Sequence, residues 1–158
     1  MEIQIRQLIQ PQESLLGIMT GWMYQWWGQR EGYAREAVQD YMRHSCQQDR
    51  LPRTYGLFLG DALIGMYQLR LDDLFVRPDV YPWLANVYLE PAYRGKGYGG
   101  LLLRSVQQNA RLLAGCRELF LYTTHTGLYE KYGWQLVGKI DTHLAGQRMQ
   151  RLYRLPIE

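Results

Sequence analysis

Apolar and polar residues alternate from Glu2 to Ile9, which is the period of a strand with one buried face. The period changes to three and four residues over Gln12–Trp27, and the same helical period returns over Tyr33–Gln48. The stretch from Gly28 to Gly32 interrupts it. The pattern therefore predicts one strand followed by two separate helices.

Two apolar runs come next, Tyr55–Leu59 and Ala62–Leu71, with only Gly60-Asp61 between them. Apolar runs on either side of so short a polar turn predict a β-hairpin. Asp72–Tyr81 contains a proline and several aspartates and predicts a loop. Trp83–Glu90 is a mostly apolar run of the kind found in buried strands.

A third helix is expected to begin at Gly99, because Leu103, Val106, Ala110 and Leu113 recur at spacings of three and four. The elements expected after it are a strand at Glu118–Tyr122, a short helix at Gly127–Tyr132 closed by Gly133, and strands at Trp134–Ile140 and Met149–Leu155 joined by a hairpin loop at Asp141–Gln147.

This order, β-α-α-β-β-β-α-β-α-β-β, predicts a single α/β domain over residues 1–158. Trp83–Glu90, the following helix and Glu118–Tyr122 form one β-α-β unit, so their strands should be parallel with a right-handed crossover. The other connections favour antiparallel pairing. We therefore expect a mixed, mostly antiparallel central sheet flanked by helices.

Composition narrows the class of protein. No apolar run approaches the roughly 18 residues that cross a membrane, and no charged-then-apolar leader opens the chain, so we expect a cytoplasmic protein with no membrane partner. The net charge of +3 is spread along the chain, which argues against nucleic acid as a partner. Cys46 and Cys116 lack metal-ligand spacing, so we expect free thiols and no metal.

A glycine-rich basic turn, Pro91–Gly100, lies between the predicted central strand and the third helix. The first N–H groups of a helix have no partner within it, and glycines let a ligand approach them, so this order suits a phosphate. The Walker pattern fails because Gly97 follows Lys96. The dinucleotide pattern G-x-G-x-x-G is present, but no carboxylate ends the next strand at Leu121–Thr124.

A third pattern, Arg/Gln-x-x-Gly-x-Gly/Ala, fits from Arg94 to Gly99. The segment VYLEPAYRGKGYGGLLL, Val87–Leu103, resembles the acetyl-CoA signature of the GNAT superfamily of N-acetyltransferases. A second segment, LYEKYGW at Leu128–Trp134, resembles that family's Leu-Tyr-Glu-Lys-x-Gly-Phe/Trp motif. The resemblance implies a GNAT-like fold and acetyl-CoA as co-substrate.

The resemblance also implies roles for individual residues. The pyrophosphate of CoA would be bound by Arg94 and by the backbone N–H groups of Gly95, Lys96, Gly97, Tyr98, Gly99 and Gly100. The pantetheine arm would pair with the backbone of Val87, Tyr88 and Leu89, as an added strand does. Tyr129 would be the general acid that protonates the departing thiolate, and its alternative interpretation is a core tyrosine.

The residue that removes the acceptor's proton is less well defined by the sequence. We predict Glu90, at the end of the central strand, with Asp72, Asp73 and His125 as alternatives acting through water. Asp72 and Asp73 could instead bind a cationic acceptor. The resemblance implies that the first two helices overhang the acceptor site, so we expect some of the aromatic residues there to line it, the candidates being Tyr24, Trp27, Tyr33 and Tyr41.

We therefore expect an N-acetyltransferase that transfers the acetyl group of acetyl-CoA to a primary amine of a small molecule or peptide by direct attack. Neither cysteine lies in a matched motif, so no acetyl-cysteine intermediate is expected. The alternatives are a non-catalytic acyl-CoA-binding or sensing protein, and a binding module that uses only the aromatic pocket. A homodimer through an exposed edge strand near the C-terminus is a further expectation.

Overall fold

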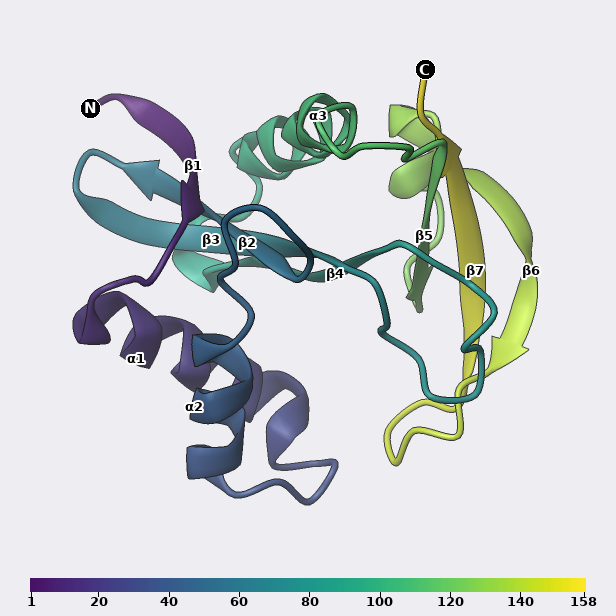
Figure 1. Ribbon diagram of the computed structural model, residues 1–158, viewed down its shortest axis with the longest axis horizontal. Helices are drawn as coiled ribbons and strands as arrows, with labels where there is room; N and C mark the ends of the chain where they lie inside the picture. Colours follow the sequence, from purple (N-terminus) through teal and green to yellow (C-terminus); the bar gives the residue numbers. More distant parts are fainter.

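The computed structural model describes all residues from 1 to 158 and shows a seven-stranded mixed sheet with the strand order β1-β2-β3-β4-β5-β7-β6 (Figure 1). The strands are β1 (Ile3–Leu8), β2 (Arg53–Leu59), β3 (Ala62–Arg70), β4 (Trp83–Leu89), β5 (Glu118–Thr123), β6 (Gln135–Asp141) and β7 (Met149–Pro156). The helices are α1 (Glu13–Met23), α2 (Arg35–Arg43) and α3 (Tyr98–Ala110), with a π-helical turn η1 (Tyr24–Gly28) and two 3₁₀ turns, η2 (Pro91–Tyr93) and η3 (Tyr129–Tyr132).

The predicted fold class is confirmed. Every neighbouring pair of strands is antiparallel except β4 and β5, which are parallel and enclose α3 in a β-α-β unit. Helices α1 and α2 lie on one side of strands β2 to β4, and α3 lies on the other (Figure 1).

Strands β4 and β5 separate almost as soon as they meet. Their only register pair is Trp83 with Phe120, at the start of β4. Beyond it β4 pairs with β3 alone, so the edge of β4 that faces β5 carries backbone groups with no strand partner. This divergence opens the middle of the sheet at the carboxyl ends of its two parallel strands.

A β-bulge in β4 turns that strand where it leaves β5. Met66 pairs with Tyr88 and Gln68 with Ala85, so Asn86 and Val87 lie together opposite Tyr67. Asn86 has a φ of 53°, and asparagine tolerates this left-handed conformation better than most residues. Bulges bend a strand and redirect its side chains, and this one does so beside the opening.

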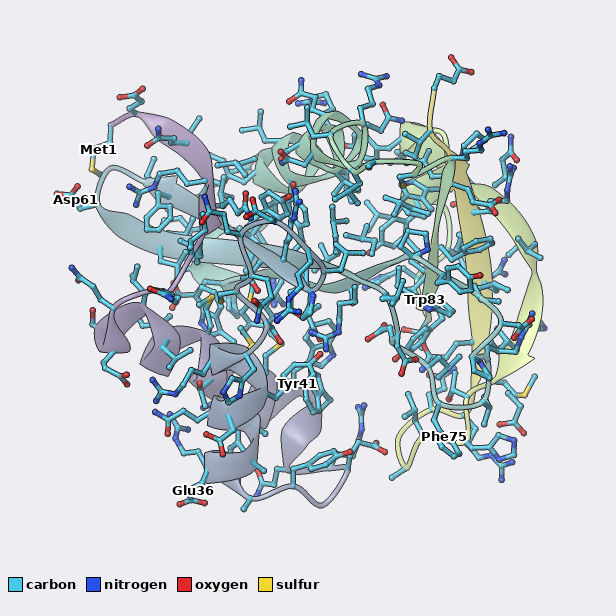
Figure 2. All side chains as sticks on the ribbon, viewed as in Figure 1. Met1, Glu36, Tyr41, Asp61, Phe75 and Trp83 are labelled. Atoms are coloured by element: carbon cyan, nitrogen blue, oxygen red, sulfur yellow. The ribbon has the colours of Figure 1, made fainter.

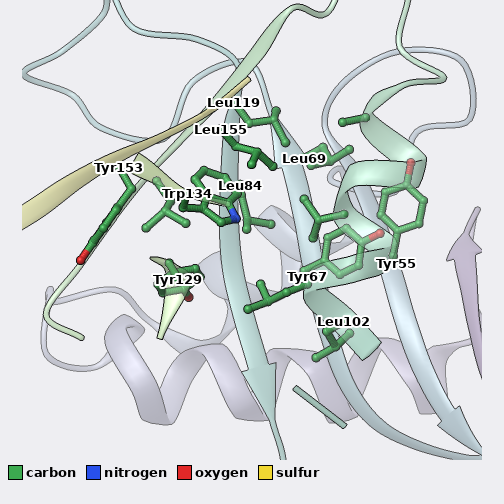
Figure 3. Close-up of a cluster of buried hydrophobic side chains, with 14 of the residues drawn as sticks. Tyr55, Tyr67, Leu69, Leu84, Leu102, Leu119, Tyr129, Trp134, Tyr153 and Leu155 are labelled. Carbon is green, nitrogen blue, oxygen red and sulfur yellow. The ribbon is translucent and has the colours of Figure 1, made fainter. Parts of the chain in front are cut away.

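Two buried clusters hold the helices on the sheet. One joins α3 to the sheet through Leu102, Leu103 and Val106, and it also contains Trp134, just before β6, and Tyr153 of β7 (Figure 3). The other packs Leu16, Met19 and Met23 of α1 and Met42 of α2 against Phe58 and Met66. Packed helices therefore hold both sides of the sheet in place next to the opening between β4 and β5.

The helices end earlier than the periodicity predicts. The expected helix Gln12–Trp27 becomes α1 followed by η1, in which the N–H of Gln29 bonds to Tyr24 O at 3.0 Å. The expected helix Tyr33–Gln48 is shortened to α2, because the side chains of Ser45 and Cys46 bond back to the carbonyls of Tyr41 and Met42. Gly133, with a φ of 90°, ends η3 as predicted.

None of the helices is long and apolar enough to span a bilayer. Nowhere do three or more histidine, cysteine or acidic side chains gather in a way that could hold a metal ion. β6 is an edge strand with Leu136 and Val137 exposed, and a homodimer through this edge stays a prediction.

Candidate active site

A cavity of about 760 Å³ occupies the opening between β4 and β5. Its wall comes from η1, α2, the loop between them, the β3–β4 loop, parts of β4 and β5, Tyr129, and the C-terminal hairpin of β6 and β7. Figure 2 labels two of the lining residues, Tyr41 on α2 and Phe75 in the β3–β4 loop. Residues from the N-terminal helices and from the C-terminal hairpin thus share one cavity.

Tyr129 lies in the cavity wall and is otherwise enclosed. It is 7% exposed, and its ring contacts Trp134 and Tyr153 at centroid distances of 6.1 and 6.0 Å (Figure 3). Burial raises the pKa of its phenol to about 12. At neutral pH the hydroxyl is therefore protonated and able to donate a proton to a group in the cavity.

The loop from Arg94 to Gly100 leaves the start of α3 open. Gly95 and Gly97 have φ values of 78° and 87°, which glycine adopts without strain. Gly97 is the N-cap residue of α3 and no side chain caps it, so the first N–H groups of the helix are free of side-chain partners. A Cβ at Gly95, Gly97 or Gly99 would meet no atom within 4 Å. The structure thus presents an accessible helix N-terminus of the kind that binds a phosphate.

Gly100 has a different surrounding. A Cβ there would lie 2.6 Å from the hydroxyl oxygen of Tyr132. The missing side chain lets η3 pack directly on the first turn of α3, and Tyr129 is the first residue of η3. This glycine therefore helps to position the predicted general acid.

Arg94 reaches back from the loop to the end of β4. Its Nε donates to the carbonyl of Leu89 at 2.8 Å, and its guanidinium lies 5.5 Å from the centre of the Tyr88 ring. Tyr88 itself stacks on Trp22 of α1 at 5.0 Å. The backbone of Val87, Tyr88 and Leu89 follows the bulge, on the strand whose edge toward β5 has no partner. That edge is where an extended ligand could add as a strand.

The predicted base candidates fall in two places. Glu90 follows β4, and its backbone N–H donates to Ile64 O at 2.8 Å, but it does not line the cavity. Asp72, Asp73 and His125 do line the cavity, together with Tyr129. Geometry therefore favours the alternatives over Glu90, whose catalytic role stays a prediction.

Asp73 and the residues around it form the charged part of the wall. Burial is the main reason that the pKa of the Asp73 carboxyl rises to about 8, against the lowering effect of Arg70. The Tyr122 hydroxyl donates to the backbone carbonyl of Asp73 at 3.4 Å. Burial raises the pKa of Tyr122 and raises that of Tyr41 to about 12, so both phenols are neutral at physiological pH.

Asn86 is a functional candidate that sequence reasoning missed. Its side-chain oxygen accepts from Trp27 Nε1 at 3.1 Å, and its amide nitrogen donates to Tyr41 Oη at 2.9 Å and to Gln68 Oε1 at 2.8 Å. These bonds tie the bulge of β4 to η1, α2 and β3. No local pattern marks Asn86, because its partners lie 18 to 59 residues away.

Three of the four aromatic residues expected at an acceptor site line the cavity, namely Trp27, Tyr33 and Tyr41. Tyr24 does not line it and instead lies 5.9 Å from the Arg35 guanidinium. The rings of Tyr33 and Tyr41 pack edge-on against Trp27 at 5.9 and 5.3 Å. The side of the cavity under η1 and α2 is therefore mainly aromatic.

Both the sequence and the fold have counterparts among known proteins. The acetyltransferase (GNAT) family matches residues 19–134. A curated relative, the spermine/spermidine N(1)-acetyltransferase of Bacillus subtilis, is 28% identical over 64 residues, which cover 37% of this chain and 42% of that protein. The match thus spans less than half the length of this curated relative.

Solved structures resemble the whole chain. An acetyltransferase from Salmonella typhimurium that modifies the N-terminal serine of ribosomal protein L7/L12 superposes with a TM-score of 0.73 at 12% identity, covering 99% of this chain and 95% of that one. A GNAT acetyltransferase from Elizabethkingia anophelis with acetyl-CoA bound gives 0.66 at 16% identity, covering 98% of each chain. At these identities the likeness shows the fold, and with the family match it establishes that the chain belongs to the acetyltransferase (GNAT) family.

Proposed function

We propose that this protein is an N-acetyltransferase that moves the acetyl group of acetyl-CoA to a primary amine of a small molecule or peptide. The observation that carries the proposal is the position of Tyr129, a protonated, buried phenol that faces a cavity beside the unpaired edge of β4. The glycine loop before α3 lies at the end of the same strand, where the charged part of a CoA molecule would bind.

The chemistry assigns a task to each part of this arrangement. Backbone groups on the free edge of β4 hold the pantetheine arm and polarise the thioester carbonyl. The amine nitrogen attacks the carbonyl carbon, a C–N bond forms and the C–S bond breaks. The Tyr129 hydroxyl donates its proton to the departing thiolate. The curated relative is named for polyamines, which supports an acceptor with aliphatic amines.

The experiment has two stages. In the first, acetyl-CoA is titrated into the protein by calorimetry at low salt, with NAD as the control, and we expect saturable binding of acetyl-CoA only. In the second, thiol release is followed with spermidine, benzylamine and a peptide with a free N-terminus, and mass spectrometry checks that the product has gained one acetyl group. Binding without thiol release from any amine would favour the non-catalytic acyl-CoA-binding or sensing protein. Failure to bind acetyl-CoA would overturn the proposal.

A further inference from the structure

We infer that Asp73 binds the ammonium group of the acceptor and takes its proton, which restricts the acceptors to amines that are cationic near neutral pH. This inference rests on the proposed function and adds to it the acceptor's charge and the residue that receives its proton. It assigns to Asp73 the role that the sequence pattern had given to Glu90.

The first argument is that the Asp73 carboxylate has no partner in the protein. It forms neither an ion pair within 4.0 Å nor a side-chain hydrogen bond, although it is half-buried in the cavity wall. The cation that lowers the pKa of Asp73 is Arg70, whose guanidinium donates to Gln68 Oε1 at 3.0 Å and Ser45 Oγ at 2.9 Å and not to the Asp73 carboxylate. Because a partly buried carboxylate without a partner is costly, a cationic ligand would offset that cost.

The second argument is the kind of surface that surrounds the carboxylate. The titratable groups that face it are Arg70 on β3, Asp72 beside it, Tyr41 on α2 and Tyr122 on β5. Both tyrosines are neutral, and the Arg70 guanidinium lies 4.5 Å from the centre of the Tyr41 ring, so this wall already holds one cation against an aromatic face. An aliphatic amine with an apolar chain matches one carboxylate flanked by aromatic rings.

The third argument separates Asp73 from the other acids of the cavity. Glu31 already accepts hydrogen bonds from the backbone N–H of Ala145 at 3.0 and 3.1 Å and from Arg30 at 3.2 Å. Asp72 is exposed to solvent, where a carboxylate attracts a cation only weakly. Asp73 is the acid of this wall that is both sheltered and free of a partner.

The reaction balances with Asp73 as the proton acceptor. The ammonium gives one proton to the Asp73 carboxylate, and the neutral nitrogen attacks the thioester carbon. As the C–S bond breaks, the thiolate takes the Tyr129 proton. The nitrogen then loses one of its two remaining protons to become the amide, and a proton returns through solvent to Tyr129. Asp73 then releases its proton to solvent. The sum is ammonium and acetyl-CoA converted to amide, CoA thiol and one proton.

Burial of Asp73 also makes the proton transfer easier, because it brings the pKa of the carboxyl closer to that of the amine. An ordinary Asp carboxylate, with a pKa near 4, is a poor base for an alkylammonium with a pKa near 10. Burial brings the Asp73 pKa to about 8 and narrows that gap. Since the base must be deprotonated, kcat/KM for a cationic amine should rise with pH through this region.

The test compares Asp73→Asn with Asp79→Asn, which removes the same charge from an exposed ion pair in the same loop. For Asp73→Asn with spermidine we expect kcat/KM to fall by about 10²-fold or more, with a higher KM and no rise in rate near pH 8. Acetyl-CoA affinity should stay close to that of the wild type, and the melting temperature should not fall below that of the wild type. Asp79→Asn should keep the wild-type pH profile.

A second measurement makes the inference testable without turnover. Calorimetry with the wild-type protein saturated with CoA should detect binding of spermidine, and Asp73→Asn should lose it. Binding that depends on Asp73 in a wild type without acetyl transfer would overturn the proposed function alone. A wild type that acetylates amines while Asp73→Asn keeps kcat/KM within about 2-fold would overturn the inference alone. A wild type that binds none of spermidine, benzylamine and the peptide would also overturn it.

Discussion

Two regions of the site are built in opposite ways. The loop region, Arg94–Gly100, is contiguous in sequence, and what it offers is backbone N–H groups at the start of a helix. The side-chain region, made of Trp27, Tyr41, Asp73 and Asn86, comes from four separate segments of the chain. Side-chain hydrogen bonds join Asn86 to Trp27 and Tyr41, and Asp73 lies in the same cavity wall without such a bond. Tyr129 belongs to neither region and faces the cavity from the C-terminal half of the sheet.

The difference explains what each region can specify. Backbone groups on a glycine loop recognise a phosphate by charge and shape, and any chain that adopts the loop can do this. In the proposed function the side-chain region would recognise a ligand through one carboxylate, several rings and a hydrogen-bond network, and these depend on the identity of each residue. We therefore expect changes in the loop region to alter cofactor binding and changes in the side-chain region to alter acceptor use.

The largest effect should come from the residue between the two regions. Tyr129→Phe should lower kcat by about 10²–10⁴-fold, the usual range for general acid catalysis, because the thiolate loses its proton donor. Acetyl-CoA affinity, measured by calorimetry, should stay unchanged because the loop region is untouched. A variant with full turnover would leave Tyr129 as a core residue, which its 7% exposure also allows.

Arg94 tests the loop region alone. Arg94→Glu should weaken acetyl-CoA binding by about 1–3 kcal/mol, the scale of a charge-assisted hydrogen bond, and should leave the KM for the amine unchanged. Arg94→Gln is the matched control, since glutamine also fits this position of the signature. It removes the positive charge without reversing it and should lose less affinity. Equal affinities for all three proteins would remove Arg94 from the cofactor site.

The same contrast decides what could be predicted from the sequence. The glycine loop, the β-α-β unit and Tyr129 were accessible because their residues are close in the chain and follow fixed spacings. The divergence of β4 from β5 could not be predicted from the sequence, because it accompanies a bulge at Asn86 opposite Tyr67 that no local pattern marks. The network around Asn86 was missed for the same reason, as its partners come from three other elements.

The choice between Glu90 and Asp73 shows the limit in physical terms. Both are acidic residues beside a predicted strand, and sequence position favoured Glu90. What distinguishes them is their position relative to the cavity, which Asp73 lines and Glu90 does not. That position depends on contacts between the β3–β4 loop and β5, such as the hydrogen bond from the Tyr122 hydroxyl to the Asp73 carbonyl. No periodicity in the sequence contains that information.

Asn86 tests whether the side-chain region is fixed by its network. Asn86→Gly keeps the left-handed backbone but removes three hydrogen bonds, so the free energy of unfolding should fall by about 2 kcal/mol. Amine KM should rise while acetyl-CoA affinity changes little. Asn86→Ala removes the same bonds and also disfavours the φ of 53°. Denaturant titrations should therefore give a lower free energy of unfolding for Asn86→Ala than for Asn86→Gly. The reverse order would contradict a left-handed backbone at the bulge.

Gly97 and Gly99 test whether the loop region depends on backbone conformation. Gly97→Ala forces a Cβ onto a residue with a φ of 87° and should cost roughly 1 kcal/mol of stability. Gly99→Ala lies in α3 with open space around its Cβ and should leave stability unchanged or improve it. Both should weaken acetyl-CoA binding if the ligand approaches this backbone closely. Unchanged affinity in Gly99→Ala would mean that the ligand stays clear of the first turn of α3.

The smallest effect, in the side-chain region, concerns stability and pH. The folded pKa of Asp73, about 8, lies above the value of 3.8 expected for the unfolded chain. The folded protein therefore binds this proton more tightly, and the stability it confers below pH 4 is lost as the pH rises to about 8. The Asp73→Asn side chain cannot ionise, so the melting temperature of this variant should exceed that of the wild type by an amount that grows from pH 6 to about pH 8 and then levels off.

Asp79→Asn should show the opposite sign, because the hydrogen bond from Arg77 lowers the pKa of Asp79 and its carboxylate stabilises the fold above the unfolded pKa. A gain of a few degrees for Asp73→Asn corresponds to about 1 kcal/mol in a chain of this size. If no gain appears by pH 9, the cavity does not desolvate the Asp73 carboxyl. The gap in pKa between base and acceptor would then not be narrowed, and Asp73 would retain only its attraction for the ammonium.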